Sequence, residues 1–232
     1  MHLLQRTILN LTTETLCPIE EARLERLLAF ERAARERGCQ HIAGVDEAGR
    51  GCLAGPVVAA ACIIPENLLI VGVNDSKQLT SQQRETLFEL MMAHPDIHVG
   101  IGIVDHKEID RINIFQASVK AMLKAVKQLP LKPDHLLVDG LKLPHPKIPT
   151  EKIIKGDTLS LSIAGASIAA KVTRDRLMVN EFHKKYPEYG FDRHKGYGTQ
   201  IHLEALDKHG PCAIHRRSYA PVQNACQAQF AF

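Results

Sequence analysis

The chain has 232 residues, of which 45% are hydrophobic and 24% charged, and its formal net charge is +3. This composition is typical of one globular domain with a substantial core, and it excludes an intrinsically disordered chain. No apolar run approaches the roughly 18 residues that a membrane span needs. Residues 1–21 also lack the basic start and long apolar core of a secretory signal, so we expect a cytoplasmic protein without membrane contact.

The cysteines are scattered and form no closely spaced pair: Cys17, Cys39, Cys52, Cys62, Cys212 and Cys226. A structural zinc site needs clustered ligands, and a disulfide scaffold needs a short, cysteine-rich chain. We therefore expect free thiols.

The N-terminal part of the chain predicts a helical extension. Residues 19–37 carry Leu24, Leu27 and Leu28 at helical spacing among charged residues, which predicts a helix. A Gly-Cys pair at 38–39 separates this helix from the next apolar run, so we treat residues 1–38 as an N-terminal extension.

The next segments favour strands and then a helix. The apolar runs 41–46 and 57–64 predict strands joined by a glycine-rich loop, and 68–73 is a further apolar run of this kind. Thr80 and Gln83 have the spacing of a capping box, which predicts the start of a helix that continues to about residue 93.

Strands and helices alternate in the second half. Residues 97–104 alternate strictly, which predicts a strand, and 108–129 have helical periodicity. Two short strands are expected at 134–140 and 151–157, and then a long Ala-rich helix over 162–186. This order predicts an α/β fold with a mixed sheet that begins antiparallel and continues with parallel strands.

The C-terminal part predicts a small helical and basic subdomain. A helix is expected over 199–209, because Gly210-Pro211 is a strong stop signal. Residues 183–217 carry seven Lys and Arg against four Asp and Glu, which favours contact with a polyanion. We expect a catalytic domain over 39–222, with this subdomain at about 180–222, and a disordered tail over 223–232.

Acidic residues end several of the predicted strands. Asp46 and Glu47 close an apolar strand before a glycine turn, where a divalent cation would offset their repulsion. A capped turn with a solvated Glu47 remains the alternative at this point. Asp139 and Asp157 each end a further strand-like run beside a glycine, and ligands bind at the carboxyl ends of strands in open α/β sheets. Asp175 is a rival for the fourth position, but a structural role for this carboxylate in the 162–186 helix is favoured.

Other catalytic motifs are absent from the sequence. The glycines of GRGCLAG precede a strand rather than a helix, and there is no Walker A, HExxH or GxSxG motif. The loop HKGYG at 194–198 combines cations, glycine and the ring of Tyr197. It predicts either a surface turn or a contact with a sugar-phosphate backbone.

Together these segments resemble a known family. GVDEAGRG, NDSKQL, LLVDG, KGD followed by SIAGASIAAKVTRD, and HKGYGT followed by HRRSYAPV occur in this order over residues 40–222. They are similar to bacterial ribonuclease HII. The resemblance implies a ribonuclease H-like fold, with a mixed sheet flanked by helices and a small helical C-terminal subdomain.

The resemblance also implies the roles of individual residues. It implies that Asp46, Glu47, Asp139 and Asp157 are the catalytic and metal-binding acids, and that Asp175 is structural. The substrate-binding residues that it implies are Gly49, Arg50, Gly51, Lys77 and Tyr197. In the family, the glycine–arginine–glycine turn contacts the 2′-hydroxyl, and the tyrosine stacks on a sugar. Cys52 departs from the family, since many members carry proline there; this loosens the turn but removes no ligand.

The implied reaction is metal-dependent hydrolysis. Two Mg²⁺ or Mn²⁺ ions about 4 Å apart would hold the scissile phosphate and activate water. The expected partners are RNA–DNA hybrids and DNA duplexes with embedded ribonucleotides, cut on the 5′ side to leave a 3′-hydroxyl and a 5′-phosphate by a monomeric enzyme. Two alternatives stay open: another nuclease of this fold, such as a junction resolvase, and a non-catalytic hybrid-binding module.

Overall fold

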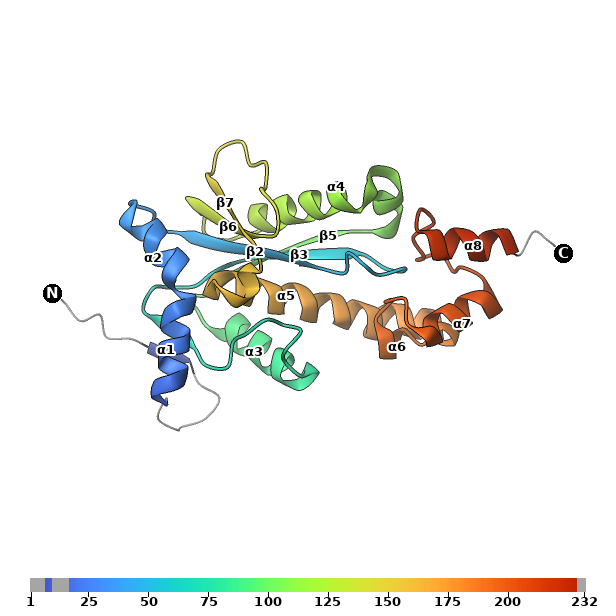
Figure 1. Ribbon diagram of the computed structural model, residues 1–232, viewed down its shortest axis with the longest axis horizontal. Helices are drawn as coiled ribbons and strands as arrows, with labels where there is room; N and C mark the ends of the chain where they lie inside the picture. Colours follow the sequence, from blue (N-terminus) through green and yellow to red (C-terminus); the bar gives the residue numbers. More distant parts are fainter. Residues whose placement is uncertain (1–6, 10–16, 229–232) are drawn as a thin grey trace.

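A mixed sheet forms the centre of the molecule (Figure 1). The computed structural model describes residues 7–9 and 17–228. Five strands lie in the order β5-β3-β2-β6-β7. Their bounds are β2 Ile42–Ala48, β3 Val57–Ile63, β5 His98–Val104, β6 His135–Asp139 and β7 Thr150–Ile153. The pairs β2–β3 and β3–β5 are antiparallel, whereas β2–β6 and β6–β7 are parallel, so the prediction of a mixed α/β sheet is confirmed.

Helices cover both faces of the sheet. Figure 1 shows α4 (His106–Lys127) on one face and α5 (Leu161–Leu177) with α3 (Ser81–Ala93) on the other. Every residue of β3 is buried, and alternate residues belong to the two cores. Burial on both faces explains why this strand is a continuous apolar run. Thr80 caps α3 in the predicted capping box with Gln83.

Two glycines let α4 lie directly on β5. A Cβ atom on Gly100 would lie 2.2 Å from the carbonyl oxygen of Ala125, and one on Gly102 would lie 2.0 Å from that of Ala121. The face of β5 that contains the two glycines therefore packs against α4. Ile103 on the opposite face is 40% exposed.

Two predicted strands differ from expectation. The run at 68–73 yields only β4 (Leu68–Ile70), which pairs with β1 (Thr7–Leu9) in a separate two-stranded sheet. The run at 151–157 leaves the sheet after Ile153, because Lys155 takes a left-handed conformation with φ of 56°. Asp157 therefore lies in the short 3₁₀ helix η1 (Gly156–Thr158) and not at the end of a strand.

The N-terminal extension is anchored to the sheet domain by a buried carboxylate. Its predicted single helix is two helices, α1 (Pro18–Leu27) and α2 (Ala29–Glu36). Oε1 of Glu31 accepts hydrogen bonds from the hydroxyls of Ser160 and Ser162, each at 2.6 Å, and from the Ser162 N–H at 3.0 Å. These donors lie at the N-terminus of α5, where the helix dipole also favours a negative charge.

The C-terminal part is helical, as predicted. Helix α5 continues as the π-helical segment η2 (Met178–His183), and then come η3 (Pro187–Tyr189), α6 (Phe191–His194), α7 (Gln200–His209) and α8 (Ala220–Ala228). The helix α8 corrects the expected disordered tail over 223–232, because Val222 and Ala225 pack against Leu53 and Leu206. Residues 229–232 lie outside the described residues. No helix of the described part is long and apolar enough to cross a membrane.

Candidate active site

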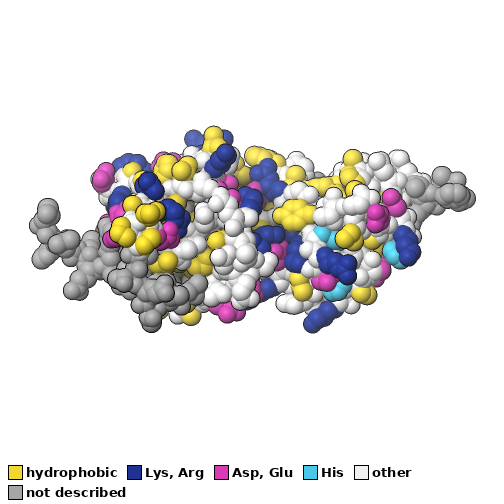
Figure 2. Space-filling view, turned by 60° about the horizontal axis from the view of Figure 1, so that its bottom comes forward, with side chains coloured by type: hydrophobic (Ala, Val, Ile, Leu, Met, Phe, Trp, Pro, Cys, Tyr) yellow, Lys and Arg dark blue, Asp and Glu magenta, His cyan; other side chains and the backbone are white. Residues whose placement is uncertain are grey.

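Neighbouring strands bring the predicted acids to one cavity. Asp46 and Glu47 lie near the end of β2, and Asp139 ends β6, whose Val138 is paired with Val45 in parallel register. The cavity has a volume of about 560 Å³. Asp46, Glu47 and Asp139 line it together with the Gly49–Gly51 turn, Lys77 and Tyr197. Figure 2 shows basic side chains near the middle of one face, where the sheet domain meets the C-terminal helices.

Asp46 is the most constrained of these carboxylates. Its side chain is buried, with a residue exposure of 6%. Burial raises its pKa well above the usual range, and the neighbouring charges of Glu47 and Asp139 raise it further. The Glu47 N–H donates to its Oδ1 at 2.7 Å. Three carboxylates this close to one another favour a bound cation over three free negative charges.

Glu47 offers an unused ligand atom. Its Oε1 lies 3.2 Å from Nη1 of Arg50, whereas its buried Oε2 has no hydrogen-bond partner in the described residues. Burial raises the Glu47 pKa, and Arg50 opposes that rise. A hard divalent cation takes oxygen ligands, so an orphaned carboxylate oxygen beside Asp46 fits such an ion.

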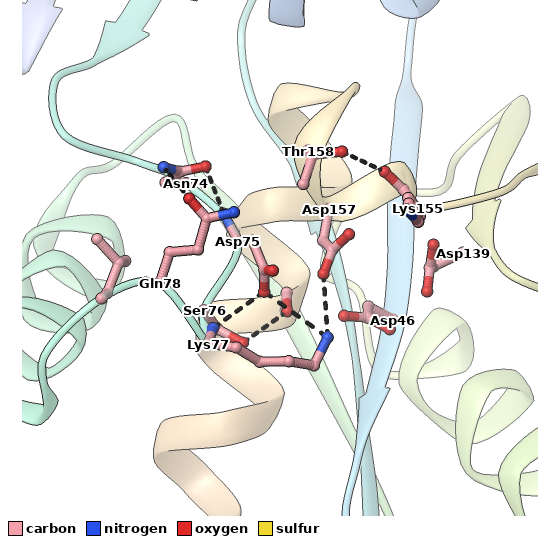
Figure 3. A network of polar contacts seen from close by, with 12 residues as sticks. Asp46, Asn74, Asp75, Ser76, Lys77, Gln78, Asp139, Lys155, Asp157 and Thr158 are labelled. Carbon is pink, nitrogen blue, oxygen red and sulfur yellow. Dashed lines mark hydrogen bonds and ion pairs between the residues drawn. The ribbon is translucent and has the colours of Figure 1, made fainter.

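Asp157 is held by a cation of the chain itself. Figure 3 shows Lys77 reaching toward Asp157 and Asp75, with Asp46 and Asp139 close by. Nζ of Lys77 lies 3.3 Å from Oδ2 of Asp157 and 3.7 Å from Oδ1 of Asp75. Burial and the adjacent Asp75 raise the Asp157 pKa, while Lys77 lowers it.

Asp157, the fourth predicted acid, lies near the other three but does not line the cavity. Asp157 is not among the residues that line the cavity, although its loop is tied to Asp139, whose Oδ1 accepts from the Gly156 N–H at 2.6 Å. Within the described ranges, no three Asp, Glu, His or Cys side chains are arranged as a ready coordination sphere. The ammonium of Lys77 lies beside Asp157 and offsets its negative charge, which is a physical reason why the acids are not grouped around one point.

Asp75 is a member of the acid cluster that the sequence reasoning did not single out. It lies in the NDSKQ segment, and its only sequence signal is its position two residues before Lys77. Asp175, the rejected rival, does not line the cavity. Its Oδ1 accepts from Nζ of Lys171 at 2.9 Å within α5.

The predicted substrate-binding residues line the same cavity. Gly49 has φ of 97°, and a Cβ atom there would lie 2.1 Å from Nε of Arg174, so both backbone and space require glycine. Tyr197 is 39% exposed, and Nζ of Lys171 lies 5.2 Å from its ring centroid. Cys52, which departs from the family pattern, is buried and forms an isolated backbone bridge with Tyr197.

Comparison with known proteins identifies the family. The family model for Ribonuclease HII matches residues 43–222, most of the chain. The chain belongs to the ribonuclease HII family. Ribonuclease HII of Chlamydia trachomatis serovar A is 54% identical over 210 residues, which cover 90% of this chain and 96% of the relative. That of Chlamydia pneumoniae is 51% identical over 207 residues, covering 89% and 96%. Membership of the ribonuclease HII family makes the chain an endoribonuclease with ribonuclease H activity on RNA–DNA hybrids.

Solved structures of related enzymes have the same fold. The crystal structure of ribonuclease H2 from Pyrococcus horikoshii OT3 matches with a TM-score of 0.67 and 29% identity, covering 83% of this chain and all of that one. A ribonuclease HIII structure, Bst-RNase HIII in complex with Mn²⁺, matches with a TM-score of 0.62 at 20% identity over 84% of this chain and 72% of that one. The prediction of a ribonuclease H-like fold is confirmed.

Proposed function

We propose that this member of the family hydrolyses the RNA strand of RNA–DNA hybrids and also cuts DNA duplexes on the 5′ side of embedded ribonucleotides, leaving a 3′-hydroxyl and a 5′-phosphate. The observation that carries the proposal is the buried Asp46, which feels the charges of Glu47 and Asp139 in the cavity that is also lined by the Gly49–Gly51 turn. The carboxylates proposed to hold cations and a backbone turn able to contact a sugar thus line the same cavity.

Asp46, Glu47, Asp139 and Asp157 would hold the divalent cations, Mg²⁺ or Mn²⁺. Asp46 and Asp139 present oxygens from adjacent strands, and Glu47 contributes its free Oε2. When bound, two such ions supply Lewis acidity at the scissile phosphate and lower the pKa of the attacking water. Lys77 is 78% exposed along its side chain and would contact a substrate phosphate from its place beside Asp157.

The remaining residues would select the substrate. The amide groups of the Gly49–Gly51 turn are suited to contact a 2′-hydroxyl, a donor and acceptor that DNA lacks. The exposed ring of Tyr197, close to the ammonium of Lys171, is suited to stack on the neighbouring sugar. Lysines and arginines of the C-terminal helices would contact the duplex backbone without reading its sequence.

A substrate panel tests the proposal. Purified protein is incubated, with and without Mg²⁺, with an RNA–DNA hybrid, a DNA duplex containing one ribonucleotide, an all-DNA duplex and a four-way junction. We expect Mg²⁺-dependent cutting of the first two and mapping of the cut to the 5′ side of the ribonucleotide. Cutting of the junction alone would instead identify a resolvase.

The variant Asp139→Asn tests the carboxylates separately. It removes one negative charge from the cluster but keeps an oxygen that accepts from the Gly156 N–H. We expect loss of cleavage by about 10²-fold or more, with the affinity for duplex retained and the melting temperature not lowered. Undiminished turnover would refute the role of Asp139.

A further inference from the structure

Two arginines are completely buried beneath the cavity wall. Arg174 on α5 and Arg216, after α7, each have 0% exposure, and they are among the largest fully buried side chains of the described residues. Neither forms an ion pair with a carboxylate in the described part of the chain. Burying a guanidinium without a counterion is costly, so these residues are poorly explained as core stabilisers.

Arg216 binds the inner side of the Gly49–Gly51 turn. Its Nη2 donates to the carbonyl oxygens of Gly49 at 2.7 Å and Pro56 at 3.2 Å. Its Nη1 donates to the carbonyl oxygen of Arg50 at 2.9 Å and to the Tyr219 hydroxyl at 3.0 Å, and its Nε donates to the carbonyl oxygen of Gly55 at 3.0 Å. One planar side chain therefore fixes four carbonyls, two within the turn and two in the chain that follows it.

Arg174 connects the chain that follows this turn to the loop that carries Tyr197. Its Nη1 donates to the carbonyl oxygen of Lys195 at 2.8 Å, two residues before Tyr197. Its Nε and Nη2 donate to the carbonyl oxygens of Pro56 at 2.9 Å and Ala54 at 3.1 Å. The two arginines share Pro56, so both loops rest on one buried cationic pair.

Fixing the carbonyls on the inside leaves the amides of the turn on the outside. No backbone hydrogen bond among the described residues uses the N–H of Arg50 or Gly51, although both residues line the cavity. Because a peptide plane is rigid, holding its C=O also sets the direction of its N–H. The turn is thus held with free donors before any substrate arrives.

We propose that Arg174 and Arg216 are positioning residues that preset the Gly49–Gly51 turn and the Tyr197 loop for recognition of a ribonucleotide. The inference rests on the proposed function, because it takes the 2′-hydroxyl as the group that the turn contacts. The two arginines thus contribute to the selectivity for ribonucleotides and not to the overall affinity for duplex.

Binding without metal tests the role, since it needs no cleavage. Dissociation constants are measured in EDTA for a DNA duplex with one ribonucleotide and for the same duplex of DNA alone. The ratio of the two constants does not depend on the fraction of folded protein. In Arg216→Lys, which keeps the charge but not the planar fork, we expect the ratio to fall about 10-fold while the all-DNA constant changes less than about 2-fold. Arg217→Met, at the exposed neighbouring position, is the matched control and should keep the wild-type ratio.

The outcomes separate the two proposals. A wild-type ratio near one would overturn ribonucleotide recognition itself. A wild-type preference that survives intact in Arg216→Lys would overturn only the role of the arginines. Amide hydrogen exchange of the wild type provides a second measurement that needs no variant. The N–H groups of Arg50 and Gly51 should exchange rapidly in the free protein and become protected by the ribonucleotide duplex. Slow exchange in the free protein would contradict the inference.

Discussion

The environment of Asp46 lowers the stability of the metal-free protein. Its carboxylate is buried beside those of Glu47 and Asp139, and its pKa is raised for these reasons. A raised carboxylate pKa means that the ionised form disfavours folding at neutral pH. The site is therefore strained electrostatically in a way that a bound cation would relieve.

Asp46→Asn should stabilise the metal-free protein and abolish hydrolysis. The amide keeps the size of the side chain but removes the buried charge, and a gain of about 1 kcal/mol would raise the melting temperature by roughly 2–4 °C. Thermal unfolding in EDTA measures this shift. Asp175→Asn is the control, because its carboxylate is already paired with Lys171, and its melting temperature should not rise. A lower melting temperature for Asp46→Asn would contradict the electrostatic account.

The packing of β5 against α4 depends on two residues without side chains. Gly100 and Gly102 face the helix backbone, whereas Val99 and Ile101 pack on the core at the other face of the sheet. Helix α4 also contains a break at Asn113, where φ is 66°. Strand β5 pairs with the central strand β3, which pairs in turn with β2.

Gly102→Ala should destabilise the protein by about 1–3 kcal/mol, because its Cβ would lie 2.0 Å from the carbonyl oxygen of Ala121 and the helix must move. Urea unfolding measures the loss. Gly51→Ala is the matched control for stability, since no atom lies within 4 Å of its added Cβ. Equal midpoints for the two variants would show that α4 is not in tight contact with β5.

At the scale of the whole molecule, two neutral histidines, His202 and His215, connect segments of the C-terminal part. Nδ1 of His215 accepts from the Cys212 N–H at 3.0 Å, so its proton is on Nε2, which lies 3.0 Å from Nε2 of His202. His202 in turn donates from Nδ1 to the carbonyl oxygen of Tyr197 at 2.9 Å. Burial lowers the pKa of His202 to about 4 and that of His215 to about 3.

Stability should therefore fall as the pH drops below the usual histidine range. An unfolded His202 titrates near 6.5 and the folded one near 4, so its contribution is complete above pH 6.5 and is lost as the pH falls toward 4. At pH 5 the loss from this residue is on the order of 2 kcal/mol. Urea unfolding of wild type and His202→Gln at pH 7.5 and pH 5 measures it. The free energy of unfolding of the variant should depend less on pH. Carboxylates with a raised pKa make the protein more stable as the pH falls, but they do so equally in both proteins. Identical pH dependence in the two would contradict the role of His202.

The amino-acid sequence by itself determined the main elements, and its motifs named the four candidate acids. Strand alternation, the capping box at Thr80 and Gln83, and the glycine stop at Gly210 are local patterns, and local patterns depend only on neighbours along the chain. The sequence placed Asp46 and Asp139 at the ends of two strands, and the parallel pairing of β2 with β6 in the structure brings those ends to the same edge of the sheet.

Only the tertiary structure decided what surrounds those acids. Lys77 meets Asp157 across 80 residues of chain, and Arg216 meets Gly49 across 167. The left-handed turn at Lys155 took Asp157 off its predicted strand, and a hydrophobic contact ordered the tail as α8. Such contacts depend on which surfaces pack together and on which polar groups lose their water. Neither property is encoded in the spacing of residues within one segment.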